Sequence, residues 1–92
     1  MKNTKVHPGD RVKDVKCTKS SLRVDLEDGR TIIVPLAWYP RLLNATAKQR
    51  ANWRAAGGGF GIHWPDIDED LSVDGLLRGL PAPGARKLAA QK

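Results

Sequence analysis

Apolar and polar positions alternate along the first part of the chain, with the period of two that is typical of half-buried β-strands. Residues 21–26 alternate throughout, and apolar-rich stretches on either side predict strands over residues 11–17 and 31–36. Pro35 has no backbone N–H to give to a neighbouring strand. The third strand is therefore predicted to end there or to lie at a sheet edge.

The connection between the second and third strands is predicted to be a three-residue turn, with Gly29 in the left-handed conformation. A two-residue Asp-Gly turn would place apolar and charged side chains on the same face of the hairpin. The three-residue turn instead pairs Val24 with Ile32 and Leu22 with Val34, which builds one apolar face.

Helix signals follow these strands. Pro40 suits the first position of a short helix. Thr46 and Gln49 have the spacing of a capping box, which predicts a second helix over residues 47–56 that ends at Gly57.

The next stretch predicts a link, a strand and a helix. The glycine-rich residues 57–61 predict a flexible link that leads into a fourth strand over residues 62–64. A serine cap then begins a last helix over residues 73–78, with Leu76 and Leu77 facing the core.

These elements together predict an α+β fold: a small, mainly antiparallel sheet of three or four strands, with two or three short helices on one face. The 92 residues are enough for one domain. We expect that domain to span residues 1–80. Residues 81–92 contain two prolines, a glycine and a polar end, and are predicted to form a flexible basic tail.

The net charge of +6 is unevenly distributed along the chain. Residues 1–54 hold 12 Lys or Arg against 5 Asp or Glu, a balance of +7. Residues 55–80 have a balance of −4, and residues 81–92 one of +3. A basic body attracts anionic partners, so nucleic acid binding is one alternative function.

The chain contains no apolar run that approaches the ~20 residues of a membrane span. Its basic start is not followed by the apolar segment of a secretory signal peptide. We therefore expect no membrane partner and a cytoplasmic location.

Metal and cofactor motifs are not supported by the sequence. Asp66, Asp68 and Asp70 have the spacing of the first ligands in a calcium loop. Leu71 and Leu77, however, stand where that loop needs glycine and a bidentate glutamate. The glycine-rich run also matches no phosphate-binding motif. We expect no metal site and no cofactor.

Catalysis remains an alternative that rests on His63 with Asp66, Asp68 or Glu69, which could hold a metal or exchange protons. A zinc site requires more His or Cys ligands at defined spacing. A hydrogen-bonding role for His63 is therefore favoured, and no catalytic residue is predicted.

Aromatic and basic residues give the best candidates for a binding surface. Arg50, Trp53 and Arg54 would share one face of the predicted second helix, and Trp, Tyr and Arg are enriched at interface hot spots. The competing interpretation is that Trp38 and Trp53 complete a small core, with the arginines covering their edges. The predicted partner-binding residues are Trp38, Tyr39, Arg41, Arg50, Trp53, Arg54, His63, Trp64, Asp68 and Asp70.

Several of these residues form a pattern that resembles a bacterial family catalogued as domain of unknown function 2442. The resemblance runs from about residue 12 to residue 80, and its most specific part is residues 61–77. The residues that carry it are Val34-Pro-Leu36, Tyr39-Pro-Arg-Leu42, Ala45-Thr46, Arg50, Trp53, Gly61-Ile-His-Trp-Pro65, Asp68-Glu-Asp70, Ser72-Val73 and Leu76-Leu77.

The resemblance implies a small α+β domain without an established activity. Some relatives carry a helix-turn-helix domain after this one, which implies regulatory proteins. Others are encoded beside a second small protein, in an arrangement that resembles a toxin–antitoxin pair. The 92 residues do not include the appended DNA-binding domain, so a DNA-binding role is not carried over.

The leading hypothesis is therefore a non-enzymatic protein-binding or regulatory module, an antitoxin-like partner of a neighbouring small protein. The alternatives are a nucleic-acid-binding protein and an enzyme that uses His63 and nearby acids. An exposed strand at the sheet edge could also pair with a second copy to form a homodimer.

Overall fold

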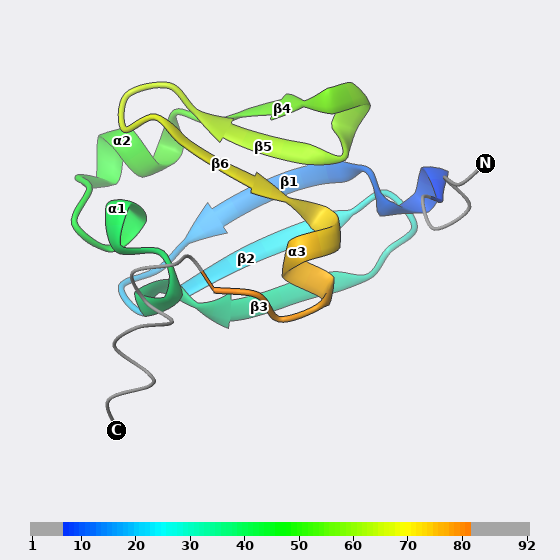
Figure 1. Cartoon of the computed structure of the whole chain (residues 1–92), viewed down its shortest axis with the longest axis horizontal. Helices are drawn as coiled ribbons and strands as arrows, with labels where there is room; N and C mark the ends of the chain where they lie inside the picture. The colour runs from blue at the N-terminus through cyan, green and yellow to red at the C-terminus, as the bar shows by residue number, and fades with distance from the viewer. Residues whose placement is uncertain (1–6, 82–92) are drawn as a thin grey trace.

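Two small antiparallel sheets and three short helices make up the computed structural model, which describes residues 7–81 (Figure 1). The first sheet has the order β1 (Val12–Cys17), β2 (Ser21–Leu26) and β3 (Thr31–Pro35). The second has the order β4 (Arg54–Ala56), β5 (Gly61–Trp64) and β6 (Glu69–Ser72). The helices are α1 (Pro40–Leu43), α2 (Ala47–Ala51) and α3 (Val73–Leu77), and the 3-10 turns are η2 (Pro8–Asp10), η3 (Leu36–Trp38) and η4 (Gly57–Gly59).

The predicted α+β class is confirmed, but residues 7–81 form six strands in two sheets instead of three or four strands in one sheet. The difference comes from β4, which lies within the predicted second helix, and from β6, a segment for which no strand was predicted. Of the predicted tail, only Pro81 falls within the described residues.

The predicted hairpin register is confirmed. Val24 pairs with Ile32 and Leu22 pairs with Val34. Gly29 has a φ of 98°, the left-handed conformation that glycine adopts without steric cost. The hairpin ladder ends at the turn, where the backbone N–H of Leu26 donates to the carbonyl of Arg30 over 2.8 Å.

The predicted starts of the first two helices are also confirmed. Pro40 occupies the first turn of α1. At α2, the Thr46 hydroxyl accepts from the Gln49 N–H over 3.1 Å, and the Gln49 side chain accepts from the Thr46 N–H over 2.9 Å. Two of the unpaired donors at the start of α2 are satisfied in this way.

The predicted length of the second helix was wrong. It ends at Ala51, and residues 54–56 leave it to pair with β5 as the short strand β4. Asn52 follows the helix with a ψ of 80°, which is not helical. Alanine-rich residues fit either structure, and the hydrogen bonds offered by β5 decide between them.

The glycine-rich segment is a defined turn and not the flexible link that was predicted. Gly57, Gly58 and Gly59 have φ values of 59°, 73° and 100°, which only glycine adopts readily in succession. They join β4 to β5 as a hairpin. The Arg11 side chain fixes the turn, because its Nε donates to the Gly58 carbonyl over 3.1 Å.

The last helix begins as predicted, since the Ser72 hydroxyl accepts from the Gly75 N–H over 2.9 Å. Leu76 is buried, whereas Leu77 is 45% exposed, so the prediction that both leucines face inward was wrong. A helix this short turns one stripe toward the core. Val73 and Leu76, three residues apart, occupy that stripe.

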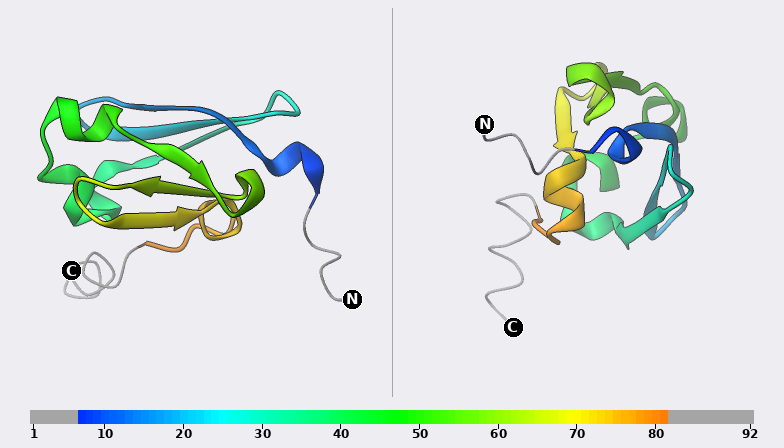
Figure 2. Two further views of the ribbon diagram at one scale, coloured as in Figure 1. Left: turned by 90° about the horizontal axis from the view of Figure 1, so that it is seen from above. Right: turned by 90° about the vertical axis from the view of Figure 1, so that its right-hand side faces the viewer.

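One core lies between the two sheets, which form two layers in the view from above (Figure 2). The first sheet and the segment after it contribute most of this core, and β5 and α3 contribute the rest. Its buried residues are Val12, Val15, Leu22, Val24, Leu26, Val34, Leu36, Tyr39, Leu42, Ile62, Trp64, Val73 and Leu76.

Candidate partner-binding site

Two of the predicted binding residues lie in the core. Tyr39 is 1% exposed and Trp64 is 0% exposed, so neither offers surface to a partner in this conformation. The Trp64 indole N–H donates to the Arg50 carbonyl over 3.1 Å, as a buried indole requires. Trp38 and Trp53 are partly buried and pack against the same core. Their placement agrees with the competing interpretation that they complete it.

Arg50 holds two helices together. Its Nε donates to the carbonyl of Leu42 over 2.8 Å, and its Nη2 donates to the carbonyl of Leu43 over 2.7 Å. These carbonyls lie at the end of α1, where the carbonyl of Leu42 also accepts from the Ala45 N–H over 3.1 Å. Because α2 ends at Ala51, Arg54 lies on β4, and the predicted helical face that would unite it with Arg50 does not form.

Arg41 reaches across to the turn between β5 and β6. Its Nη1 donates to the carbonyl of Asp68 over 2.5 Å and lies 3.9 Å from Oε1 of Glu69. Asp68 itself has a φ of 52°, a left-handed conformation that a non-glycine residue adopts at a cost. The hydrogen bond from Arg41 therefore stabilises a turn in which the backbone of Asp68 has an unfavourable conformation.

Glu69 is the one acid of this region that points inward, and its side chain is 12% exposed. Burial raises the pKa of the Glu69 carboxyl above its ordinary value, while the Arg41 charge opposes that rise. Burial, together with the Glu69 charge, raises the pKa of Tyr39 to about 12. The buried Tyr39 hydroxyl has no hydrogen-bond partner within residues 7–81.

His63 and Asp70 form a polar pair on the outer face of the second sheet. His63 lies opposite Asp70 in the β5–β6 ladder, and its Nδ1 is 2.7 Å from Oδ1 of Asp70. Arg54 lies opposite His63 on the other side, in the β4–β5 ladder. Three of the predicted partner-binding residues, Arg54, His63 and Asp70, therefore lie in one row across the second sheet. The Asp70 side chain is 71% exposed, more than that of His63.

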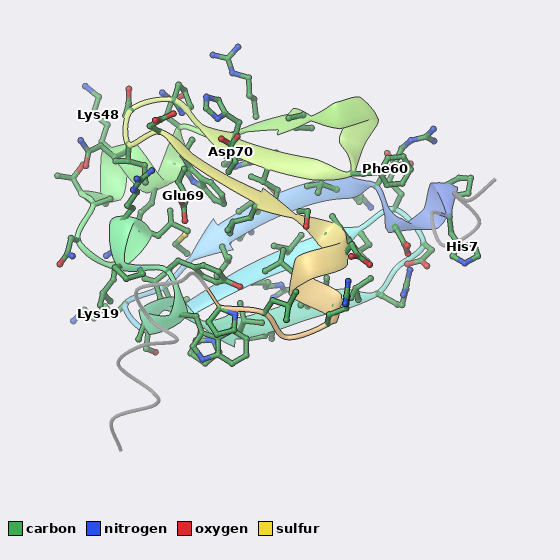
Figure 3. The ribbon with its side chains drawn as sticks, viewed as in Figure 1. His7, Lys19, Lys48, Phe60, Glu69 and Asp70 are labelled. Carbon is green, nitrogen blue, oxygen red and sulfur yellow. The ribbon has the colours of Figure 1, made fainter. Side chains whose placement is uncertain are left out.

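β6 is an edge strand, and a hollow lies on each side of it. One is a groove of about 290 Å³ between β6 and the segment that carries α3 and Leu80, with Tyr39 and Glu69 among its lining residues. The other is a shallow hollow of about 450 Å³ over the outer face, where Ala56 has a small side chain and Gly61 has none. Figure 3 shows the carboxylates of Glu69 and Asp70 leaving β6 in different directions.

Apolar side chains are exposed beside the groove. Leu77 is 45% exposed and Leu80 is 44% exposed. The partly buried Trp38 ring lies against Gly79, where a Cβ would sit 3.9 Å from it. We call Trp38, Leu77 and Leu80 the apolar patch. Leu80 connects it to the groove, because it also lines that groove.

Residues 7–81 contain no group of three or more His, Cys, Asp or Glu side chains that could hold a metal ion. No helix in that range is long and apolar enough to cross a bilayer. Cys17 is half-buried, and burial raises the pKa of its thiol.

Glu69, Leu77 and Leu80 were not among the predicted partner-binding residues, although Glu69 was named in the catalytic alternative. A signal for Glu69 was present: Ile67, Glu69, Leu71 and Val73 alternate with polar residues, as in a strand that turns one face inward. The calcium-like spacing of the aspartates in the same stretch is the other half of that alternation. No comparable signal marks Leu80, whose exposure depends on how α3 packs.

Comparison with known proteins places this arrangement in a family. Residues 12–82 match the model of a family described as protein of unknown function (DUF2442). A crystal structure of a protein of unknown function from Rhodospirillum rubrum ATCC 11170 matches with a TM-score of 0.69 and 31% identity, over 82% of this chain and 93% of that one.

A second solved structure shares the fold. The solution NMR structure of an uncharacterized protein from Chromobacterium violaceum matches with a TM-score of 0.67 and 20% identity, over 78% of this chain and 68% of that one. No curated protein matches the sequence. Because the family model spans most of the chain, the protein belongs to the DUF2442 family of proteins of unknown function.

Proposed function

We propose that the chain is a non-enzymatic module that binds another protein through the apolar patch and the adjoining β6 edge. The observation that carries this proposal is the exposure of Leu77 and Leu80 on either side of Gly79, the residue next to which the Trp38 ring lies. Leu80 also lines the groove. Neighbouring exposed apolar side chains with a polar rim are typical of protein interfaces. Aromatic anchors such as Trp38 are enriched among the residues that dominate binding energy.

The finer proposal is that the module is cytoplasmic and regulatory, and that its partner is a small protein encoded beside it, as an antitoxin's would be. Support for this comes from the family resemblance, in which some relatives are encoded beside a second small protein. The distribution of charge also supports a localised binding surface, because residues 55–80 carry a net charge of −4 within a chain whose net charge is +6.

Affinity purification of the tagged full chain from its host, with and without nuclease, tests the proposal. We expect one small protein at near-equal amount, unaffected by nuclease. A double substitution, Leu77→Asp with Leu80→Asp, should abolish its recovery by placing charge in the apolar patch. Ile33→Asp is the matched control: Ile33 is 63% exposed on the first sheet, outside the patch, and its variant should retain the partner.

Three results would contradict the proposal. Retention of the partner by the double variant would show that the apolar patch is not the interface. An equal loss of the partner by the Ile33→Asp variant would show that an added charge weakens binding wherever it is placed on the surface. Recovery of nucleic acid, with all proteins lost after nuclease and binding that weakens steeply with salt, would favour the nucleic-acid alternative.

A further inference from the structure

The direction of the backbone groups along β6 follows from one hydrogen bond. The Val73 N–H donates to the Phe60 carbonyl over 2.9 Å, which makes these residues a hydrogen-bonded pair of the antiparallel ladder. Bonded and non-bonded pairs alternate along such a ladder. Leu71 and Glu69 therefore direct their backbone groups at β5. Asp70 directs its N–H and C=O away from the sheet.

The edge of β6 thus turns the N–H and the C=O of Asp70 away from β5, and the N–H also interacts with the Glu69 carboxylate of the same strand. Among the described residues, no backbone group of another element bonds to either. The neighbouring outward carbonyl, that of Asp68, is already bonded by Arg41. The groove of about 290 Å³ runs beside this edge, and Leu76 and Leu80 contribute apolar side chains to its lining. An extended chain in this groove would find one backbone pair to bond and an apolar wall to contact.

The acidic side chains beside the groove favour a basic ligand. Glu69 is largely buried, yet its nearest cation, Arg41, is 3.9 Å away, beyond hydrogen-bond distance. Asp70 is exposed on the same strand. A Lys or Arg on the incoming chain would give the Glu69 carboxylate the close cationic partner that it lacks.

The same charges disfavour a second copy of this chain as the occupant. Antiparallel pairing of two β6 strands through their outward Asp70 groups would place the Asp70 carboxylate of one copy directly opposite that of the other. Like charges on directly opposed strands destabilise a sheet. A basic segment from a different protein meets no such repulsion.

We propose that β6 accepts an extended, basic segment of a partner protein as the fourth strand of the second sheet. Asp70 supplies the backbone bonds, and Glu69 pairs with a Lys or Arg side chain of that segment. The proposal rests on the proposed protein-binding function and names the kind of partner that the site takes.

Selection from a displayed library of random heptapeptides on the immobilised full chain provides the probe. Selected peptides should carry a Lys or Arg between β-branched or apolar residues. Asp70→Pro removes the outward N–H and leaves the bonds to β5 intact, because that N–H is not part of the ladder. We expect it to weaken binding of a selected peptide roughly tenfold, the effect of one lost backbone hydrogen bond.

Asp70→Ala is the matched control, because it removes the same carboxylate and keeps the N–H. It should weaken binding by less than about threefold, the effect of one exposed charge. Glu69→Gln should weaken a peptide with Lys at the selected position and leave unchanged the same peptide with Met there. This last comparison does not depend on a proline variant and keeps the proposal testable if Asp70→Pro fails to fold.

Amide exchange measured by NMR reports on the edge directly. The Asp70 amide should exchange rapidly in the free chain and become protected when the peptide binds. Protection of that amide in the free chain would overturn the proposal, since a second copy or the chain itself would already cover the edge. Absence of basic residues among the selected peptides, or equal binding by Asp70→Pro and Asp70→Ala, would also overturn it.

The same variants separate this proposal from the proposed function. If Asp70→Pro recovers the protein partner from the host at the wild-type level, strand addition is wrong and protein binding through the apolar patch stands. If neither the wild-type chain nor the variant recovers a protein, the proposed function itself is wrong.

Discussion

Glu69 shows how one buried acid makes stability depend on pH. Its pKa in the folded chain is raised by burial above the ordinary value of 4.5. For an acid shifted in this direction, the folded state is favoured while the carboxyl is protonated. That contribution is lost as pH rises through the folded pKa. The ionised carboxylate at neutral pH therefore lowers the free energy of unfolding.

Glu69→Gln should consequently stabilise the chain at neutral pH and have little effect below about pH 4, where the carboxyl is protonated in both states. The gain should stay under about 1 kcal/mol, because solvent and Arg41 screen part of the charge. Urea unfolding of both proteins from pH 3 to pH 8 measures the difference. A variant that is less stable at neutral pH would show that the contact with Arg41 outweighs the burial.

Arg50 is the residue whose observed role differs most from the sequence interpretation. It was grouped with surface residues for binding, yet its guanidinium bonds the last carbonyls of α1. We expect Arg50→Ala to lower the free energy of unfolding by about 1.5–3 kcal/mol, the range for hydrogen bonds from a charged group. Arg54→Ala, on the exposed face of β4, should stay within about 0.5 kcal/mol of wild type. Equal losses in urea unfolding would contradict this assignment.

At the scale of elements, the sequence predicted correctly those strands and helix starts whose signals lie within a short stretch of the chain. The first three strands, the hairpin register and the capping box each depend on residues within a few positions of one another. The strands β4 and β6 were missed for a physical reason. Each spans only three or four residues, and its hydrogen bonds come from β5. Propensity within such short segments is too weak to decide between strand, helix and loop.

The hairpin turn gives a prediction that belongs to this scale. Gly29 has a φ of 98°, and a Cβ placed there would meet no atom within 4 Å. The effect of Gly29→Ala is therefore one of backbone conformation alone. We expect a loss of about 1–2 kcal/mol in urea unfolding, the cost of a left-handed residue with a Cβ. Gly29→Asn should lose less, because asparagine tolerates this region better. A neutral Gly29→Ala would show that the turn does not set the register.

The candidate site could be predicted only in part, because it exists at the scale of the whole molecule. His63 and Asp70 were singled out separately, and the β5–β6 register brings them to within 2.7 Å. Trp64 and Tyr39 were selected by residue type, but the packing of two layers buries them. The apolar patch depends on the orientation of α3, which buries Leu76 in the core and leaves Leu77 exposed. Of these outcomes, only the burial of Leu76 has a signal in the spacing along the chain, because it lies three residues after Val73.

The shared core also makes a prediction about the whole molecule. Ile62 extends from β5 into a core that is built mostly by the first sheet. If the sheets fold as one unit, Ile62→Val should cost about 0.5–1.5 kcal/mol. That loss should accelerate exchange of the slowest amides in both sheets by the same factor, because those amides exchange through global unfolding. The exposed Ile33→Val serves as the control and should change neither sheet.

Acceleration confined to β4, β5 and β6 would instead show that the second sheet opens on its own. That result would bear on binding, since a locally opening sheet would present β6 only part of the time and weaken the apparent affinity for a partner in proportion. Uniform acceleration would mean that the edge is held in its binding geometry by the whole core. A partner strand would then dock on a preformed surface, without an ordering cost in the second sheet.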